Sequence, residues 1–583
     1  MRALHGRPAL SSLLLGYVAL LTFFRMASLR GWDEAFYIGQ LTSLFSDADL
    51  MLQNDLLAFP NQLPLRFRAL TTIADSGALQ NTFSIGPAVL HGSYLWPLLT
   101  FSERPVGPAL QYGLAVGSMA LLILTVLAMR RLLRRLGFTP TVADLATALS
   151  ILGGPLALYG TRSYLTTHLP SALFTAGFIL ACSAWLETRA LRHALLTGLL
   201  AGLLVINRWQ DAVLVLALLP ALAASWREPA HRDLRGFATA TVVFLAIVSI
   251  QCRAWYIQFG SPLLVPQGPD YMNWTRPQVQ ALLVSTYHGL VPWAPAFAAG
   301  LLRLLWAWRR PGTDASRPLM IGFALVVPAM IYLSACPVDW WGGDSYGPRR
   351  LASLTPLAAI GLAHLLDPLS RRARAAVVVL VIGWMAFTTS AYFSNLDDLS
   401  VVFTGTTGRF NPRPADSYQS ATWTDPPWSI PRVLRPGFTF SEKPKWSDRP
   451  LGVLAVFLVT CVAGLAWRGL ARSPRAQRAA LAAALTWLAF VLVVVCRAPN
   501  NALWNRQWRD VVRNQPFRTA EVAFPKGVDD AASFVLAVRA FAAGRGDEGD
   551  RFLARVEGRK YVGLDRESVL KLANGDTTRP RER

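Results

Sequence analysis

Two adjacent carboxylates near the start of the chain are of a residue type that can do chemistry. Asp33 and Glu34 follow an apolar block, Tyr37 stands three residues after Glu34, and Asp55 lies in the same polar stretch. A carboxylate can deprotonate a hydroxyl group or bind a divalent cation such as Mg²⁺ or Mn²⁺. From spacing alone, the two carboxylates could equally be solvated loop residues. The stretch therefore predicts a general base or a cation ligand, with Asp33 and Glu34 as alternatives for the same role.

Arginines occur in two further polar segments. Arg208 and Gln210 lie in a short turn between two apolar blocks, whereas Tyr346, Arg349 and Arg350 end a glycine-rich segment. Guanidinium groups bind phosphate through paired hydrogen bonds. These two segments therefore predict a binding site for a phosphate group.

These polar residues also have structural interpretations. Arg208 could form an ion pair with Asp211 across its turn. His168, which precedes Pro170 at a predicted helix start, could be an interfacial residue rather than a group that acts on a phosphate. Most Trp and Tyr side chains at such positions are interfacial anchors. The sequence alone leaves both interpretations open.

The composition indicates what kind of protein must position these residues. Of the 583 residues, 53% are hydrophobic and only 16% are charged, whereas about a quarter of the residues of a soluble protein are charged. The apolar residues form long blocks, so we expect an all-α, polytopic membrane protein. Disorder, a fibrous repeat and a soluble enzyme are excluded.

The formal net charge of +22 comes largely from arginine clusters between the apolar blocks. This distribution is typical of cytoplasmic loops and argues against binding to nucleic acid. Only five of the 57 basic residues are lysines, a bias that is typical of GC-rich bacterial genes and indicates a bacterial inner membrane. The five cysteines lie in or beside apolar blocks, without the spacing of a metal site or a disulfide framework.

A transmembrane helix needs about 20 apolar residues, and about thirteen segments meet this requirement. With a cytoplasmic N-terminus, thirteen spans place every arginine cluster in the cytoplasm. One further apolar block, 83–101, contains Gly-Pro and Trp-Pro pairs, and we expect an interfacial helix there. The predicted spans are residues 8–25, 107–129, 141–160, 169–186, 193–207, 211–226, 236–253, 286–308, 318–336, 350–366, 374–393, 451–467 and 478–496.

This topology predicts one catalytic membrane domain over residues 1–496. Its outer side would carry a long first loop, 26–104, with interfacial helices, and another long loop, 394–449. Residues 497–583 would form a small outward-facing tail that is partly helical. The polar segments would all meet at the outer face, where the charge of Arg349 runs against the usual bias. The combination predicts a site for a lipid-linked phosphate substrate.

The motifs, in the order in which they occur along the chain, resemble those of the GT-C superfamily of membrane glycosyltransferases. The chain looks most like a bacterial branch similar to dolichyl-phosphate-mannose and aminoarabinose transferases, from the first span to about residue 366. The motifs are Asp33-Glu34 with Tyr37, the pattern Ser43-Leu44, Asp47, Asp49 and Asn54-Asp55, Gly86-Pro87, Thr167-His168, Arg208-Trp209-Gln210, and the segment from Trp340 to Arg349.

The resemblance implies that a sugar moves, with inversion, from a polyprenyl-phosphate donor to a glycan, lipid or protein acceptor on the outer, periplasmic side. It implies that Asp33 is the base and that Glu34 shares this role or orients the acceptor. Arg349 and Arg208 would hold the phosphate as it leaves, with assistance from His168. Some enzymes of this superfamily need a divalent cation and others do not. The other residues predicted to bind substrate are Tyr37, Asp55, Gln210, Tyr346 and Arg350.

Three other functions remain open on the sequence. A transporter or flippase of a lipid-linked or anionic substrate would need polar residues along a path through the middle of the membrane, where the apolar blocks are poor in charges. A membrane scaffold for envelope assembly would have no need of carboxylates beside arginines. A transferase of whole oligosaccharides to protein would differ in its acceptor, which the sequence does not show.

Overall fold

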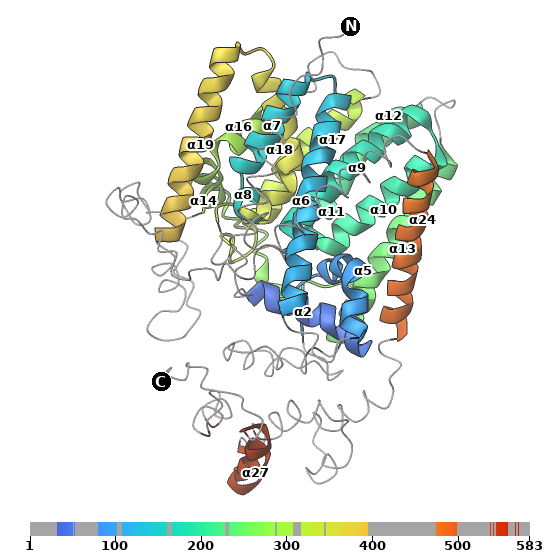
Figure 1. The fold of residues 1–583 in the computed structure, drawn as a ribbon, viewed down its shortest axis with the longest axis vertical. Coiled ribbons are helices and arrows are strands. Elements are labelled where there is room, and N and C mark those ends of the chain that lie inside the picture. The colour runs from blue at the N-terminus through green and yellow to red at the C-terminus, as the bar shows by residue number, and fades with distance from the viewer. Residues whose placement is uncertain are drawn as a thin grey trace.

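The computed structural model shows a bundle of helices (Figure 1). Within the described part of the chain, strand pairing is limited to one isolated bridge between Met272 and Pro337. The described residues are 32–50, 52, 80–101, 108–159, 166–227, 233–285, 288–306, 316–342, 346–394, 474–497 and 544–557, together with 537, 540, 541, 566 and 570.

Along the chain, the helices fall into a first-loop group, the main bundle and one helix of the tail. The first group comprises α2 (Trp32–Thr42), the π-helix η1 (Ser43–Asp47) and α5 (Gly86–Phe101). The bundle comprises α6 (Pro108–Arg135), α7 (Pro140–Leu152), α8 (Leu156–Tyr159), α9 (His168–Thr188), α10 (Leu191–Asn207), α11 (Ala212–Val215), α12 (Leu219–Arg227), α13 (Leu234–Phe259), α14 (Val279–Val284), α15 (Leu290–Trp293), α16 (Pro295–Leu304), α17 (Ser316–Ala335), α18 (Thr355–Leu366), α19 (Arg371–Ser394) and α24 (Pro474–Arg497). Short 3₁₀ turns are η2 (Trp209–Asp211), η3 (Leu216–Leu218), η5 (Pro269–Tyr271) and η7 (Arg349–Leu354), and the tail contains α27 (Gly546–Glu557).

Five of the described helical segments are long and apolar enough to cross a membrane. This finding agrees with the expected class of an all-α membrane protein. Because two of the thirteen predicted spans, 8–25 and 451–467, lie outside the described residues, the count of thirteen stays a prediction. The loop 394–449 lies almost entirely outside them too. The five segments are Gly113–Arg135, His168–Thr188, Trp209–Arg227, Leu234–Phe259 and Arg317–Ala335.

Glycine and proline divide two of the predicted spans. The segment 141–160 forms α7 and α8, which are separated by Gly-Gly-Pro at residues 153–155. The segment 286–308 includes the short helices α15 and α16, and Pro295 begins α16. Proline lacks a backbone N–H and its ring clashes with the preceding turn of a helix. As a result, α8 begins as a separate helix after Pro155, and it carries Tyr159, which is a residue of the candidate site.

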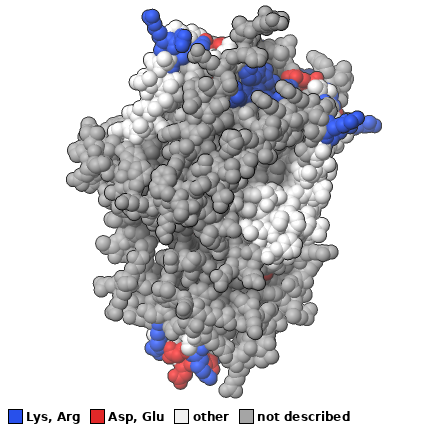
Figure 2. Space-filling model, in the orientation of Figure 1, with Lys and Arg blue, Asp and Glu red and all other residues white. Residues whose placement is uncertain are grey.

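The two ends of the bundle differ in charge. α6 ends in Arg134 and Arg135, and α12 ends at Arg227. Figure 2 shows Lys and Arg side chains at the upper end of the molecule and, beside Asp and Glu, around the tail helix α27 at the lower end. Of the first-loop helices, α2 and α5 lie low in Figure 1. If the end of the bundle that carries Arg134, Arg135 and Arg227 faces the cytoplasm, α2 and α5 lie on the outer side of the membrane.

The first-loop helix α5 is fixed in place by three helices of the bundle. A Cβ atom at Gly86 would lie 2.3 Å from Cα of Asn207, so α5 begins against the end of α10 and only glycine fits there. Gln251 of α13 accepts a hydrogen bond from the N–H of Ile85 at 2.8 Å. Trp487 of α24 donates to a carbonyl of α5 at 3.1 Å. An interfacial position for α5 stays a prediction, but its packing sets the first loop against the turn after α10.

Candidate functional site

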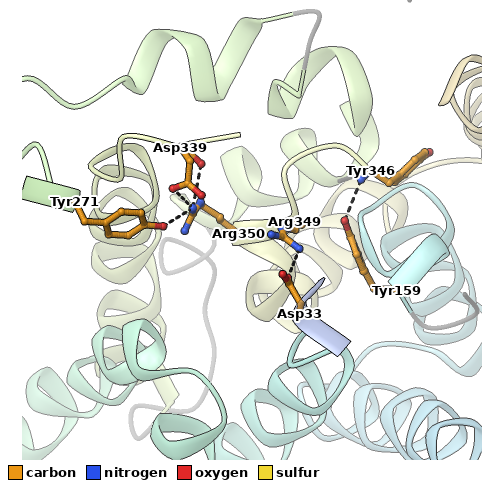
Figure 3. Close-up of polar contacts among 7 residues, drawn as sticks. All are labelled: Asp33, Tyr159, Tyr271, Asp339, Tyr346, Arg349 and Arg350. Carbon is orange, nitrogen blue, oxygen red and sulfur yellow. Dashed lines mark hydrogen bonds and ion pairs between the residues drawn. The ribbon is translucent and has the colours of Figure 1, made fainter. Parts of the chain in front are cut away.

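Asp33 lies in the first turn of α2, where the positive end of the helix dipole favours a carboxylate. Its Oδ2 accepts a hydrogen bond from Nη1 of Arg349 at 2.7 Å (Figure 3). The Asp33 side chain is 26% exposed and that of Arg349 is 21% exposed. Burial acts to lower the pKa of Arg349, but Asp33 and Tyr159 act against it, and the pKa is raised above its ordinary value. Two predicted site residues that are far apart in sequence are thus direct partners.

Two glycines shape the backbone that leads into Arg349. Gly342 has a φ of +75° and Gly347 a φ of +57°, a region that other residues adopt only with strain. A Cβ atom on Gly342 would also lie 2.7 Å from Nε of Arg349. The glycine-rich motif therefore leaves room for the Arg349 side chain to lie against its own loop.

Tyr159 and Tyr346 fix the same backbone from the side of the bundle. The Tyr159 hydroxyl accepts a hydrogen bond from the N–H of Tyr346 at 3.0 Å. The Tyr346 ring packs edge-on against Trp293, with 5.3 Å between ring centroids. Its hydroxyl forms a 2.7 Å hydrogen bond with Thr388 of α19, and Figure 3 shows it turned away from Asp33. Tyr346 therefore anchors the loop by both its backbone and its side chain.

Arg350 is held by a different carboxylate. Its Nη2 donates to Oδ1 of Asp339 at 2.6 Å, to the carbonyl of Asp339 at 3.0 Å and to the Tyr271 hydroxyl at 2.9 Å. The N–H of Val338 donates to the carbonyl of Tyr271 at 2.9 Å, so the loops after α13 and α17 are joined. Burial raises the pKa of Tyr271 to about 12, with Arg350 acting in the opposite direction. Arg350 thus ties two loops to the start of η7.

Arg208 caps the end of α10 in an extended conformation and is 8% exposed. When the amide oxygen of Gln210 is oriented towards it, that oxygen accepts hydrogen bonds from Nη2 and, at 3.2 Å, from Nε. Asp211 is fully buried and acts electrostatically on Arg208. Its carboxylate interacts with the hydroxyl groups of Ser171 and Ser353 and does not lie within salt-bridge distance of Arg208. The ion pair predicted as an alternative for this turn therefore has no direct contact.

Tyr37 and His168 lie close to the same arginines. Tyr37 is 6% exposed, and burial raises its pKa, with Arg349 and Arg208 acting in the opposite direction. His168 is the first residue of α9, and its ring centroid lies 4.5 Å from that of Tyr159. The charges of Arg208 and Arg349 both act on His168. One acid, two aromatic residues and the arginines therefore form one polar cluster.

The structure brings most of the predicted site residues together. Asp33 contacts Arg349 of the cluster, and Glu34, the next residue, is buried at 8% exposure. Tyr346 supports the loop by its contacts, and Asp55 lies outside the described residues. The catalytic and binding roles of all these residues stay predictions. The residues that meet in the cluster are Asp33, Tyr37, His168, Arg208, Gln210, Arg349 and Arg350.

Three residues of the site were not among the predicted site residues. Tyr159 precedes a polar stretch at the end of a predicted span, and Asp339 directly precedes the motif from Trp340 to Arg349. Because both residues stand next to polar segments of the predicted site, the sequence could have indicated them. The sequence does not indicate Tyr271, because it stands in an irregular loop and reaches Arg350 only through the pairing of two loops.

A metal site can be tested only on part of the chain. Within the described residues, no group of three or more His, Cys, Asp or Glu side chains is placed to hold a metal ion. Asp33 and Asp339 each contact an arginine instead. The prediction that Asp55 binds a cation or an acceptor concerns a residue outside that part.

Comparison with known proteins gives a distant likeness in fold. No protein-family model and no curated protein matches the chain. Among solved structures, the chain is similar to the archaeal oligosaccharyltransferase AglB from Archaeoglobus fulgidus in complex with an inhibitory peptide and a dolichol-phosphate, with a TM-score of 0.37 and 13% identity. The match covers 69% of this chain and 60% of that chain, so this chain spans less than two thirds of that protein. The activity has to follow from the site itself.

Proposed function

We propose that this protein is an integral-membrane glycosyltransferase that moves a sugar from a polyprenyl-phosphate donor to an acceptor. The observation that carries the proposal is the contact between Asp33 and Arg349, 2.7 Å apart, in a cluster that also contains Arg208 and Arg350. Such a transfer requires a base that accepts the proton of the acceptor hydroxyl and cations that stabilise the leaving phosphate.

The reaction is a single displacement at the anomeric carbon of the sugar. Asp33 accepts the proton of the acceptor hydroxyl as its oxygen bonds to that carbon. The bond between the carbon and the phosphate oxygen breaks, and its electron pair leaves with the polyprenyl phosphate. Arginines offset the charge that develops on the phosphate. One displacement inverts the anomeric configuration, in agreement with the implied stereochemistry.

Several features support the proposal. The site motifs occur in the order seen in the GT-C superfamily, and five segments are apolar enough to cross a membrane. A lipid-linked donor could therefore reach the site from within the bilayer. Ionisable residues are costly inside a membrane and tend to be functional. Their gathering around α2 and η7 favours chemistry at one place over transport along a path.

The proposal includes the side of the membrane and the compartment. The site lies near α2 and α5 at the lower end of Figure 1, and Lys and Arg gather at the upper end of Figure 2. By the positive-inside rule the upper end is cytoplasmic. We infer an active site that faces the periplasm from the bacterial inner membrane, in the synthesis of a cell-envelope glycan or glycolipid.

A direct assay tests the proposal. The purified full chain in detergent is incubated with a panel of short-chain polyprenyl-phosphate sugars and an extract of cell-envelope glycans and lipids as acceptors. We expect release of polyprenyl phosphate and an inverted glycoside from one of the donors. The Asp33→Asn variant is the control that should give neither. If vesicles that contain the protein instead move a labelled donor across the bilayer without cleaving it, the protein is a transporter and the proposal is wrong.

A further inference from the structure

The three arginines of the site differ in what neutralises them. Arg349 contacts the carboxylate of Asp33, and Arg350 contacts that of Asp339. Arg208 has no carboxylate within salt-bridge distance among the described residues, and its hydrogen-bond acceptor is the neutral amide oxygen of Gln210. Its Nη1 is buried and has no hydrogen-bond partner in the same part of the chain.

A buried guanidinium without a contacting anion is energetically unfavourable. Burial lowers the pKa of Arg208 to about 10, against the raising effect of Asp211, and the charges of Arg350 and Arg349 lower it further. The pKa of Arg349, by contrast, is raised. Among the three arginines of the cluster, Arg208 is therefore the one that no carboxylate of the described residues contacts; Asp211 acts on it only from beyond salt-bridge distance.

The other two arginines already donate hydrogen bonds to carboxylates of the protein. Arg349 offers Nη1 to Oδ2 of Asp33 at 2.7 Å, which leaves Oδ1 of Asp33 outside that contact. The Nη2 atom of Arg350 is shared among three oxygens from two loops. A phosphate that displaced Asp33 or Asp339 from its arginine would break an ion pair and leave a carboxylate uncompensated, and one that used the remaining N–H donors would bring its negative charge close to that carboxylate. A phosphate that bound Arg208 would break no ion pair.

We propose that Arg208 binds the phosphate of the donor, whereas Arg349 is a positioning residue that orients the Asp33 carboxylate. The inference rests on the proposed function and assigns different tasks to two arginines that the motifs treat alike. The phosphate supplies the anion that Arg208 lacks. Arg349 keeps Asp33 in one orientation, with Oδ1 available for the hydroxyl of the acceptor.

The test measures binding of neryl phosphate, a short polyprenyl phosphate, to the purified full chain in detergent. Arg208→Gln should weaken binding at least about tenfold, since a charge-assisted hydrogen bond is lost. The double variant Asp33→Asn with Arg349→Gln removes one charge of each sign, and it should bind within about twofold of the unmodified protein. Arg192→Gln, an exposed position on α10, is the matched control and should have no effect.

Two lysine variants keep the test decisive if Arg208→Gln fails to fold. Arg208→Lys retains the charge but loses the planar fork of donors, so binding should weaken several-fold. Arg349→Lys retains a cation next to Asp33, so binding should stay unchanged. Inorganic phosphate at the same concentrations shows whether the phosphate group alone is recognised.

The outcomes separate this inference from the proposed function. Loss of binding in the charge-neutral double variant would show that the pair of Asp33 and Arg349 holds the phosphate, and full binding by both Arg208 variants would show that Arg208 does not. Either result would overturn the inference. If the arginine pattern is as expected but no sugar transfer occurs with any donor, the phosphate site stands and the glycosyltransferase proposal fails. If neryl phosphate does not bind to the unmodified protein at all, both are wrong.

Discussion

At the scale of single residues, two of the three arginines of the site are each paired with a carboxylate. Asp33 contacts Arg349 and Asp339 contacts Arg350, and each pair joins segments that are distant in the chain. Partly exposed ion pairs contribute little to stability. We infer that these pairs are used to orient functional groups, which has consequences for individual substitutions.

The first prediction concerns the base. Asp33→Asn keeps the volume of the side chain but removes its ability to accept a proton, so transfer should fall by about 10²- to 10⁴-fold. Its thermal unfolding temperature should stay close to that of the unmodified protein. Glu34→Gln is the matched comparison, and it should retain most of the activity because Asp33 is the residue that contacts the arginine cluster. If Glu34→Gln instead lost activity and Asp33→Asn retained it, Glu34 would be the base.

The second prediction concerns Tyr159. Tyr159→Phe removes the acceptor for the N–H of Tyr346, which should cost about 1 kcal/mol in the free energy of unfolding. The turnover number should fall by a larger factor than the loss of about 1 kcal/mol in stability would produce, because a small displacement of Arg349 moves the Asp33 carboxylate out of position. Tyr256→Phe is the control, since Tyr256 is 51% exposed on α13. Equal turnover in the two variants would show that the Tyr159 hydroxyl does not position the loop.

At the scale of elements, the site depends on how α2 and α5 rest on the bundle. α2 supplies Asp33, and α5 begins where its backbone meets the end of α10, next to Arg208. Stacking of Phe45 on Trp487, with 5.5 Å between ring centroids, extends this support to α24. The first-loop helices are thus held by elements that come much later in the chain.

The third prediction tests this contact. Gly86→Ala would place a Cβ atom 2.3 Å from the backbone of Asn207, so α5 would have to move, at a cost of about 1–3 kcal/mol in the free energy of unfolding. Gly383→Ala is the matched control, because a Cβ atom there meets no atom within 4 Å. That variant should be neutral or stabilised by up to about 1 kcal/mol. Thermal unfolding of both variants in detergent is the measurement, and equal unfolding temperatures would contradict the proposed tight contact.

At the scale of the whole molecule, the proposed orientation depends on the arginines at the ends of the bundle helices. Figure 2 shows Lys and Arg at the upper end and, beside Asp and Glu, at the lower end where the tail helix α27 lies; the candidate site belongs to α2, η7 and the loops around them. The exposed apolar side chains of α13, α17 and α19 include Leu245, Leu325 and Val379. Apolar exposure of this kind on long helices is what contact with lipid requires.

The fourth prediction tests this orientation. In a variant whose five cysteines are replaced by alanine, Trp274→Cys in the loop after α13 should react with a membrane-impermeant maleimide in spheroplasts. Arg372→Cys at the start of α19 should react only after the membrane is permeabilised. Both positions are exposed, so a difference in labelling reports the side of the membrane. Labelling in the opposite order would place the site in the cytoplasm.

The sequence by itself determined that this is an all-helical membrane protein and which residue types could do chemistry. Both follow from local composition, because a span needs about 20 apolar residues and its backbone must satisfy its own hydrogen bonds. The tertiary structure decided which charges meet, namely that Asp33 pairs with Arg349, that Tyr271 reaches Arg350 and that no carboxylate of the described residues lies within salt-bridge distance of Arg208. Such pairings depend on distances between segments hundreds of residues apart. Those distances are set by packing between helices, which no local periodicity encodes.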